Sequence, residues 1–255
     1  MRNVITALGI GMIMAAADKP AEPAKGLYGL PALAQAAVNR LAAQIGAEIF
    51  WSSDEKGRGV PDPDEFVVLG TGGALKKWVD PASGGGRNGK LTKGFETLWR
   101  KLVEMRRRET VRAELDQGLP TLVLTDLGAA TKEDKEFVGR MLAVAQLVES
   151  LHMKQQGSLA FAQKVAKADP ESKALFSRNQ GPWCRAAKTE HDPFCNALAD
   201  FPRQVWDTYP ADEPHDQKIC KKLSALPEGK ELMSPFTVVR KEMDKGKDRY
   251  LAVPI

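Results

Sequence analysis

The chain has 255 residues, of which 43% are hydrophobic and 27% are charged, enough for one good-sized core or two small ones. Its 37 basic and 33 acidic residues nearly balance, so the composition gives no reason to expect a nucleic-acid partner. Beyond the first 17 residues, no stretch approaches the ~18 consecutive apolar residues of a transmembrane helix. We therefore expect a globular protein without a membrane span.

The first 17 residues predict a secretion signal. Arg2 forms a short basic region, Val4 to Met14 is uncharged and mostly apolar, and Ala15 to Ala17 offers small residues for cleavage. The alternative, an amphipathic first helix, would need a polar face that this segment lacks. We therefore expect export to the periplasm or the extracellular space, with a flexible leader at residues 18–29.

Residues 54–65 (DEKGRGVPDPDE) resemble the calcium loop of an EF-hand. That loop needs an acid at position 1, a glycine at position 6 and a bidentate glutamate at position 12. Asp54, Gly59 and Glu65 occupy these places, and Asp62 occupies position 9. Residues 31–48 have the helical spacing expected of the incoming helix.

Two ligand positions of this loop carry cations instead of oxygens. Lys56 and Arg58 occupy positions 3 and 5, where they would repel a divalent ion. Asp54, Asp62 and Glu65 therefore predict at most weak calcium binding, at about 10⁻⁴ to 10⁻³ M. The favoured alternative is an acid-rich turn that its own cations neutralise, with no cofactor bound.

The segment after this loop has two interpretations. Residues 66–73 (FVVLGTGG) are similar to a strand that enters a phosphate-binding turn. The dinucleotide fingerprint, however, would need glycine in place of Leu75 and a βαβ unit, and no β-rich segment follows. We favour an interrupted helix over residues 65–79.

Three helices are predicted downstream of the glycine-rich loop 80–90, which is the best candidate for a boundary within the domain. Thr92 can cap a helix that runs to about Gln117, with an apolar inner face and a charged outer face of solvated ion pairs. Thr131 and Asp134 resemble a capping box, and the six-turn helix that follows ends at Gly157. A shorter helix covers about residues 159–167. The inner face of the first helix contains Phe95, Leu98, Trp99, Leu102 and Met105. Its outer face contains Arg100, Lys101, Arg106, Arg107, Arg108 and Arg112, with Glu104, Glu109 and Glu114 between them. The apolar stripe of the second helix contains Phe137, Val138, Met141, Leu142, Ala145, Val148 and Leu151.

The last third of the chain has a different composition. Prolines and aromatic residues crowd residues 181–214, where regular helix is not expected. Two β-prone runs, 236–239 and 250–253, flank the turn-forming sequence DKGKD at 244–248, which predicts a terminal hairpin.

Three cysteines in a chain that we expect to be exported indicate one disulfide and one free thiol. The preferred pair is Cys184 with Cys195, because proline-rich loop surrounds both. Cys220 lies in an amphipathic stretch, where a free thiol can be buried as a small apolar group.

Catalytic motifs are weak in this sequence. A zinc site from Cys184, His191, Cys195 and His215 can be drawn, but its spacings fit no common zinc arrangement, and a disulfide is the simpler interpretation. A nucleophilic Cys195 with His191 as its base would require Cys195 to be free of a disulfide. The serine-hydrolase pattern G-x-S-x-G does not occur.

One segment resembles a known family. Residues 178–184 (RNQGPWC), 189–190 and 192–197 (DPFCNA), together with 234–240 and the ending 252–254, are similar to a group of bacterial exported proteins associated with dipeptidyl-peptidase-III-like zinc peptidases. In that family the zinc ligands lie on a helix with two histidines and a glutamate, plus a further glutamate. No position here matches that motif, so the resemblance implies an amino-terminal portion or a shortened relative, and no catalytic residue is carried over.

The sequence predicts a mainly α fold: one multi-helix domain over residues 30–255, a proline-rich loop region joined by the disulfide, and a C-terminal hairpin. The function that follows is an exported, non-catalytic binding or scaffold protein with a protein or peptide partner. The alternatives are a weak extracellular calcium module at Asp54, Asp62 and Glu65, and a peptidase or hydrolase whose site the motifs do not show.

Overall fold

The computed structural model describes residues 22–69, 75–83, 89–118, 125–213 and 216–254. The predicted secretion signal, the glycines at 70–73 and His215 lie outside the described residues. The contacts divide the chain into two compact units, Pro20–Asp207 and Thr208–Ile255, here called the N-terminal and C-terminal units. The division falls at Asp207–Thr208.

The predicted fold class, mainly α, is wrong. Among the described residues the chain forms eight α-helices and two two-stranded sheets, and only 44% of the structure is helical. Long irregular segments account for the difference, because many backbone groups there bond to one another in turns and loops instead of in helices. The elements are α1 (Gln35–Gln44), β1 (Ile49–Trp51), β2 (Phe66–Val68), α2 (Leu75–Trp78), α3 (Lys93–Leu115), α4 (Lys132–Gln155), α5 (Ala162–Val165), α6 (Pro170–Asn179), α7 (Gln217–Ser224), α8 (Gly229–Leu232), β3 (Thr237–Asp244) and β4 (Lys247–Pro254), with 3₁₀ turns η1 (Leu27–Gly29), η2 (Pro81–Ser83) and η4 (Leu159–Phe161).

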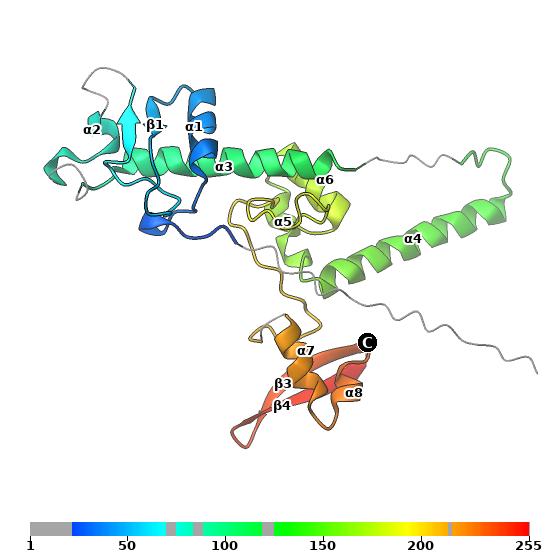
Figure 1. The fold of residues 1–255 in the computed structure, drawn as a ribbon. Helices are drawn as coiled ribbons and strands as arrows, with labels where there is room; N and C mark the ends of the chain where they lie inside the picture. The colour runs from blue at the N-terminus through cyan, green and yellow to red at the C-terminus, as the bar shows by residue number, and fades with distance from the viewer. Residues whose placement is uncertain (1–21, 70–74, 84–88, 119–124, 214–215, 255) are drawn as a thin grey trace, which may run out of the picture. The chain divides into compact units, whose positions relative to one another are not determined.

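The first core of the N-terminal unit forms where α1, α2 and the β1–β2 pair pack on the first half of α3 (Figure 1). The Thr92 hydroxyl accepts a hydrogen bond from the Phe95 N–H and so caps α3, as predicted. Phe95 and Trp99 stack with ring centroids 5.6 Å apart, and Trp51 of β1 meets Trp99 edge-on at 6.1 Å. The predicted inner face of this helix is therefore confirmed as the centre of the core.

The predicted interrupted helix over residues 65–79 is wrong for the first residues of this range. Residues 66–68 form β2, which pairs antiparallel with β1 in the register Ile49↔Val68. The run of one aromatic and two β-branched residues favours a strand over a helix turn. Because the pairing is antiparallel, it does not supply the parallel βαβ unit of a dinucleotide site.

The second core of the N-terminal unit packs the later part of α3 against α5, α6 and the loop 181–201. Helix α6 was not predicted, although its start has clear signals: the Asp169 carboxylate accepts from the Ser172 N–H, and Pro170 occupies the first turn. The disulfide between Cys184 and Cys195, predicted from the sequence, is part of this core.

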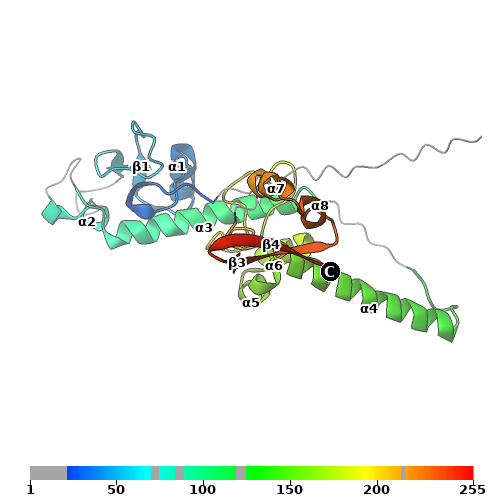
Figure 2. The same cartoon turned by 90° about the horizontal axis from the view of Figure 1, so that it is seen from below.

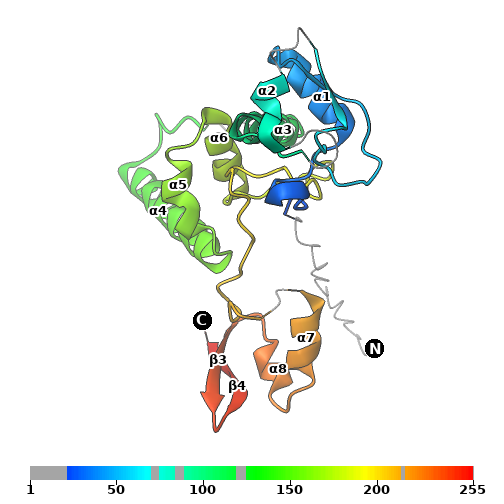
Figure 3. The same ribbon diagram turned by 90° about the vertical axis from the view of Figure 1, so that its left-hand side faces the viewer.

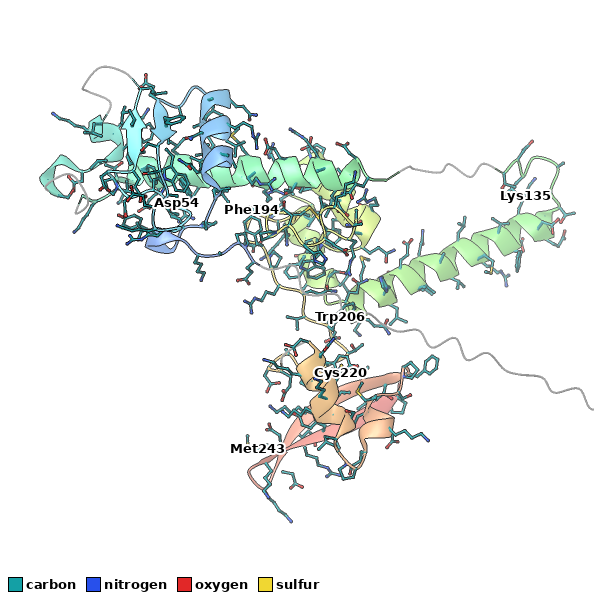
Figure 4. All side chains as sticks on the ribbon, viewed as in Figure 1. Asp54, Lys135, Phe194, Trp206, Cys220 and Met243 are labelled. Carbon is teal, nitrogen blue, oxygen red and sulfur yellow. A yellow bond between two sulfur atoms is a disulfide. The ribbon has the colours of Figure 1, made fainter. Side chains whose placement is uncertain are left out.

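The C-terminal unit packs α7 and α8 against the β3–β4 hairpin (Figure 3). The hairpin is confirmed, with Asp244 opposite Lys247 and a two-residue turn in which Lys245 and Gly246 both have positive φ. Cys220 is free but exposed on α7, so its predicted burial is wrong (Figure 4). The buried face of α7 is formed instead by Ile219 and Leu223.

Candidate functional site

The loop at residues 54–65 keeps part of an EF-hand's geometry. Gly59 at position 6 has φ +65°, and the Asp54 carboxylate accepts hydrogen bonds from the Arg58 and Gly59 N–H groups (Figure 4 labels Asp54). The Glu65 carboxylate accepts from the Asp62 N–H at 2.9 Å. The chain then continues into β2 and not into an outgoing helix.

The protein's own cations bind the buried acid of this loop. The Lys56 ammonium lies 2.9 Å from one oxygen of Asp62, and the Arg58 guanidinium lies 3.1 Å from the other. Both oxygens of Asp62 are therefore occupied by the residues at positions 3 and 5. Asp54, Asp62 and Glu65 do not converge as a ligand cluster within the described part of the chain.

The described residues bring three other ligand-type side chains together, namely Glu114, Cys184 and Cys195. The two cysteines are joined as a disulfide, so neither offers the thiolate that a metal ion or a nucleophilic attack requires. His191 is exposed and lies 3.6 Å from Glu190, away from this cluster. The structure thus favours the disulfide over the zinc site and over a Cys195 nucleophile.

Glu114 is fully buried beside the disulfide and is saturated with donors. Its carboxylate accepts from the Arg178 guanidinium, the Asn179 amide, the Thr189 hydroxyl and the backbone N–H groups of Arg185 and Ala186. Burial alone would raise the pKa of Glu114, but these hydrogen bonds hold it below its ordinary value. The carboxylate therefore organises the loop and has no free lone pair directed at a cleft.

Arg107 forms a second buried charge centre. It was predicted to lie on the solvated face of α3, and this is wrong, since its side chain is only 3% exposed. Its guanidinium donates to Glu104, Asp169, the Ser172 hydroxyl and the Asn196 carbonyl, which uses all five N–H donors. Both buried charge centres hold α3, α6 and the disulfide loop together.

Helix α4 differs from every other long element of the described chain, because none of its residues is buried. The predicted capping box is present, with Thr131 accepting from the Asp134 N–H and Asp134 accepting from the Thr131 N–H. At the other end Gly157 has φ +69°, and a Cβ there would clash with the Val205 carbonyl oxygen. The helix is thus well defined at both ends.

The apolar stripe of α4 faces solvent, so the expectation that this helix packs with the others is wrong. Figures 1 and 2 show the helix as a rod, and in Figure 4 its side chains, from Lys135 onward, project on all sides. Its substantial contact within the described residues is with η4, at its C-terminal end. The exposed fractions are Phe137 63%, Met141 50%, Leu142 62%, Val144 50%, Leu147 70%, Val148 59% and Leu151 47%.

Such a patch is unusual on a monomer. Contiguous exposed apolar surface of more than a few hundred square ångströms marks interaction sites in soluble proteins. Among the described helices, none combines the length and the hydropathy that a bilayer span needs. The α4 stripe is accordingly the strongest candidate functional surface. Periodicity predicted an apolar face on this helix, with Val138 and Ala145 in the places now taken by Val144 and Leu147, but it carries no information on what covers that face.

Comparisons of the chain with protein-family models, with curated proteins and with solved structures gave no significant match.

Proposed function

We propose that this chain is an exported protein-binding module that holds a protein partner on the apolar face of α4 and acts without catalytic turnover of its own. The observation that carries the proposal is that seven large apolar side chains of α4 are each at least 47% exposed, and all but Leu142 lie on one side of the helix. Seven large apolar side chains facing water cost free energy, and a partner that covers them recovers it at about 25 cal/mol per Å².

Four features support export and a binding role. The first 17 residues have the pattern of a secretion signal, and the Cys184–Cys195 disulfide suits an oxidising compartment. The polar groups that could do chemistry in the second core are already engaged, because Glu114 and Arg107 bind neighbouring loops. The resemblance of residues 178–197 to exported zinc-peptidase-like proteins agrees with a non-catalytic part of such a group.

In-cell photocrosslinking tests the binding role. A photoreactive amino acid at Leu147, the most exposed residue of the stripe, is expected to capture a protein in the exporting cell. The matched control places the same group at Ala199, which is exposed in the loop 181–201. Equal crosslinking at both positions, or none at Leu147, would contradict the proposal.

A hydrolysis assay tests the non-catalytic part. The purified protein is incubated with a mixed peptide library and added zinc, and products are followed by mass spectrometry. We expect no turnover above that of a denatured control. Zinc-dependent cleavage that stays with the protein through a further chromatography step would overturn this part of the proposal.

A further inference from the structure

We propose that the partner of α4 is a second copy of this chain, paired antiparallel along the α4 helices about Val144. This inference rests on the proposed function and names the partner. It follows from three properties of α4: the spacing of its apolar residues, the side on which the N-terminal unit packs, and the order of its charges.

The spacing of the apolar residues is that of a helix–helix seam. Phe137, Met141, Val144, Val148 and Leu151 are separated by four, three, four and three residues, the heptad a/d pattern. Leu147 flanks the seam and widens it, whereas Leu142 lies on the far side of the helix. A stripe at this period packs best against another helix, since each side chain fits between those of the facing helix.

The seam is accessible along the whole helix. Met153 is the residue of α4 that packs against the second core, and it is half-buried there. At 100° per residue, Met153 points to the side of the helix opposite Val144, whereas Leu151 lies on the seam and is 47% exposed. A second helix can therefore lie along the seam without displacing the second core of the N-terminal unit, against which Met153 packs.

The order of the charges favours an antiparallel partner. The first turn of α4 contains Glu133 and Asp134 together with Lys132 and Lys135, the last turn contains His152 and Lys154, and residues 141–148 carry no charge. At 100° per residue, Glu133 and Lys154 flank the seam on the same side, whereas Lys132 and Lys135 point away from it. A two-fold axis at Val144 brings Glu133 of one copy level with Lys154 of the other. A parallel pair would instead leave Glu133 of one copy and Lys154 of the other at opposite ends of the seam.

Analytical ultracentrifugation tests the pairing, in a Cys220→Ser background because the exposed thiol could link copies on its own. We expect a reversible dimer in the micromolar range, since the seam from Phe137 to Leu151 is only two heptads long. Val144→Glu sets two like charges against each other at the axis and should give a monomer. Gln146→Glu, a charge on the opposite face of the same helix, should leave the dimer intact.

A mixing experiment excludes a folding defect as the cause. Val144→Glu and Val144→Lys should each be monomeric alone, and an equimolar mixture should form a heterodimer. To determine the relative direction of the two helices, a copy carrying Glu133→Cys is mixed with a copy carrying Lys154→Cys, and we expect the two to crosslink. Self-crosslinking of Glu133→Cys in its place would overturn the antiparallel arrangement.

The failures of the two proposals are distinguishable. A protein that stays monomeric at its highest soluble concentration, while Leu147 still captures a different protein in the cell, would overturn self-pairing and leave the binding role standing. A monomer with no capture at Leu147 would overturn both.

Discussion

Arg107 on α3 and Asp169 at the start of α6 meet with 3.1 Å between the guanidinium nitrogen and the carboxylate oxygen. Asp169 also caps α6 through the Ser172 N–H at 3.0 Å. One carboxylate therefore fixes the start of a helix and joins that helix to α3. The N-terminal unit depends on such buried charges as well as on its apolar contacts.

Removal of the Arg107 side chain should lower the free energy of unfolding. Arg107→Ala leaves Glu104 and Asp169 without their shared cation and the Asn196 carbonyl without a donor, and we expect a loss of about 3–5 kcal/mol in unfolding free energy. Arg108→Ala, a matched change at a side chain 44% exposed, should cost less than about 1 kcal/mol. Urea denaturation measures both. Equal effects would contradict the assigned role of Arg107.

Acid should weaken the N-terminal unit through Asp169. Burial alone would raise the pKa of this carboxyl, but hydrogen bonds from Ser172 and Arg107 lower it to about 2. Because the folded pKa lies below the unfolded value of about 3.9, the stabilisation is full above pH ~4 and is lost as the pH falls toward 2. The shift corresponds to roughly 2 kcal/mol. Denaturation at several pH values should show a shallower acid dependence in Asp169→Asn than in the parent protein.

Glu114→Gln tests the carboxylate beside the disulfide. The amide keeps the shape but replaces one acceptor oxygen with an NH₂ group that faces other donors, so we expect a loss of about 2 kcal/mol or more. The matched control is Glu109→Gln, which affects an exposed pair with Arg40 and should cost less than about 1 kcal/mol. Thermal unfolding followed by circular dichroism would show the difference. A control variant as unstable as Glu114→Gln would refute the assignment.

Removal of the disulfide should act on one unit only. Cys184 and Cys195 are 11 residues apart in sequence, and a ring of this size stabilises by roughly 2–3 kcal/mol. The Cys184→Ser/Cys195→Ser variant should therefore show faster hydrogen exchange in α3 and α6. Exchange in the β3–β4 hairpin should not change, and a change there would contradict the division at Asp207.

Calcium should not bind measurably to the loop at residues 54–65. Lys56 and Arg58 occupy both oxygens of Asp62, so an ion would first have to break two ion pairs. Calorimetry at millimolar calcium should give no heat above dilution. Saturable heat that disappears in Asp62→Asn would restore the calcium module as a function.

Local signals explain which elements were predictable from the sequence. Thr92, the Thr131–Asp134 pair and the Lys245–Gly246 turn specify their elements through neighbouring residues alone, so α3, α4 and the hairpin could be anticipated. Arg107 could not be placed, because a guanidinium is buried only when partners distant in sequence, here Asp169 and Asn196, supply its acceptors. Only part of the candidate site could be predicted from the sequence. The period of α4 specifies an apolar face, whereas the exposure of that face depends on the whole fold.

The disulfide loop depends on the redox state of its surroundings. The backbone N–H groups that hold Glu114 come from Arg185 and Ala186, directly after Cys184. Where cytosolic reductants keep both cysteines as thiols, that loop is untethered and the buried carboxylate lacks firmly placed donors. Under reducing conditions we therefore expect the loop 181–201, and not the C-terminal unit, to be the loosely organised part of the chain.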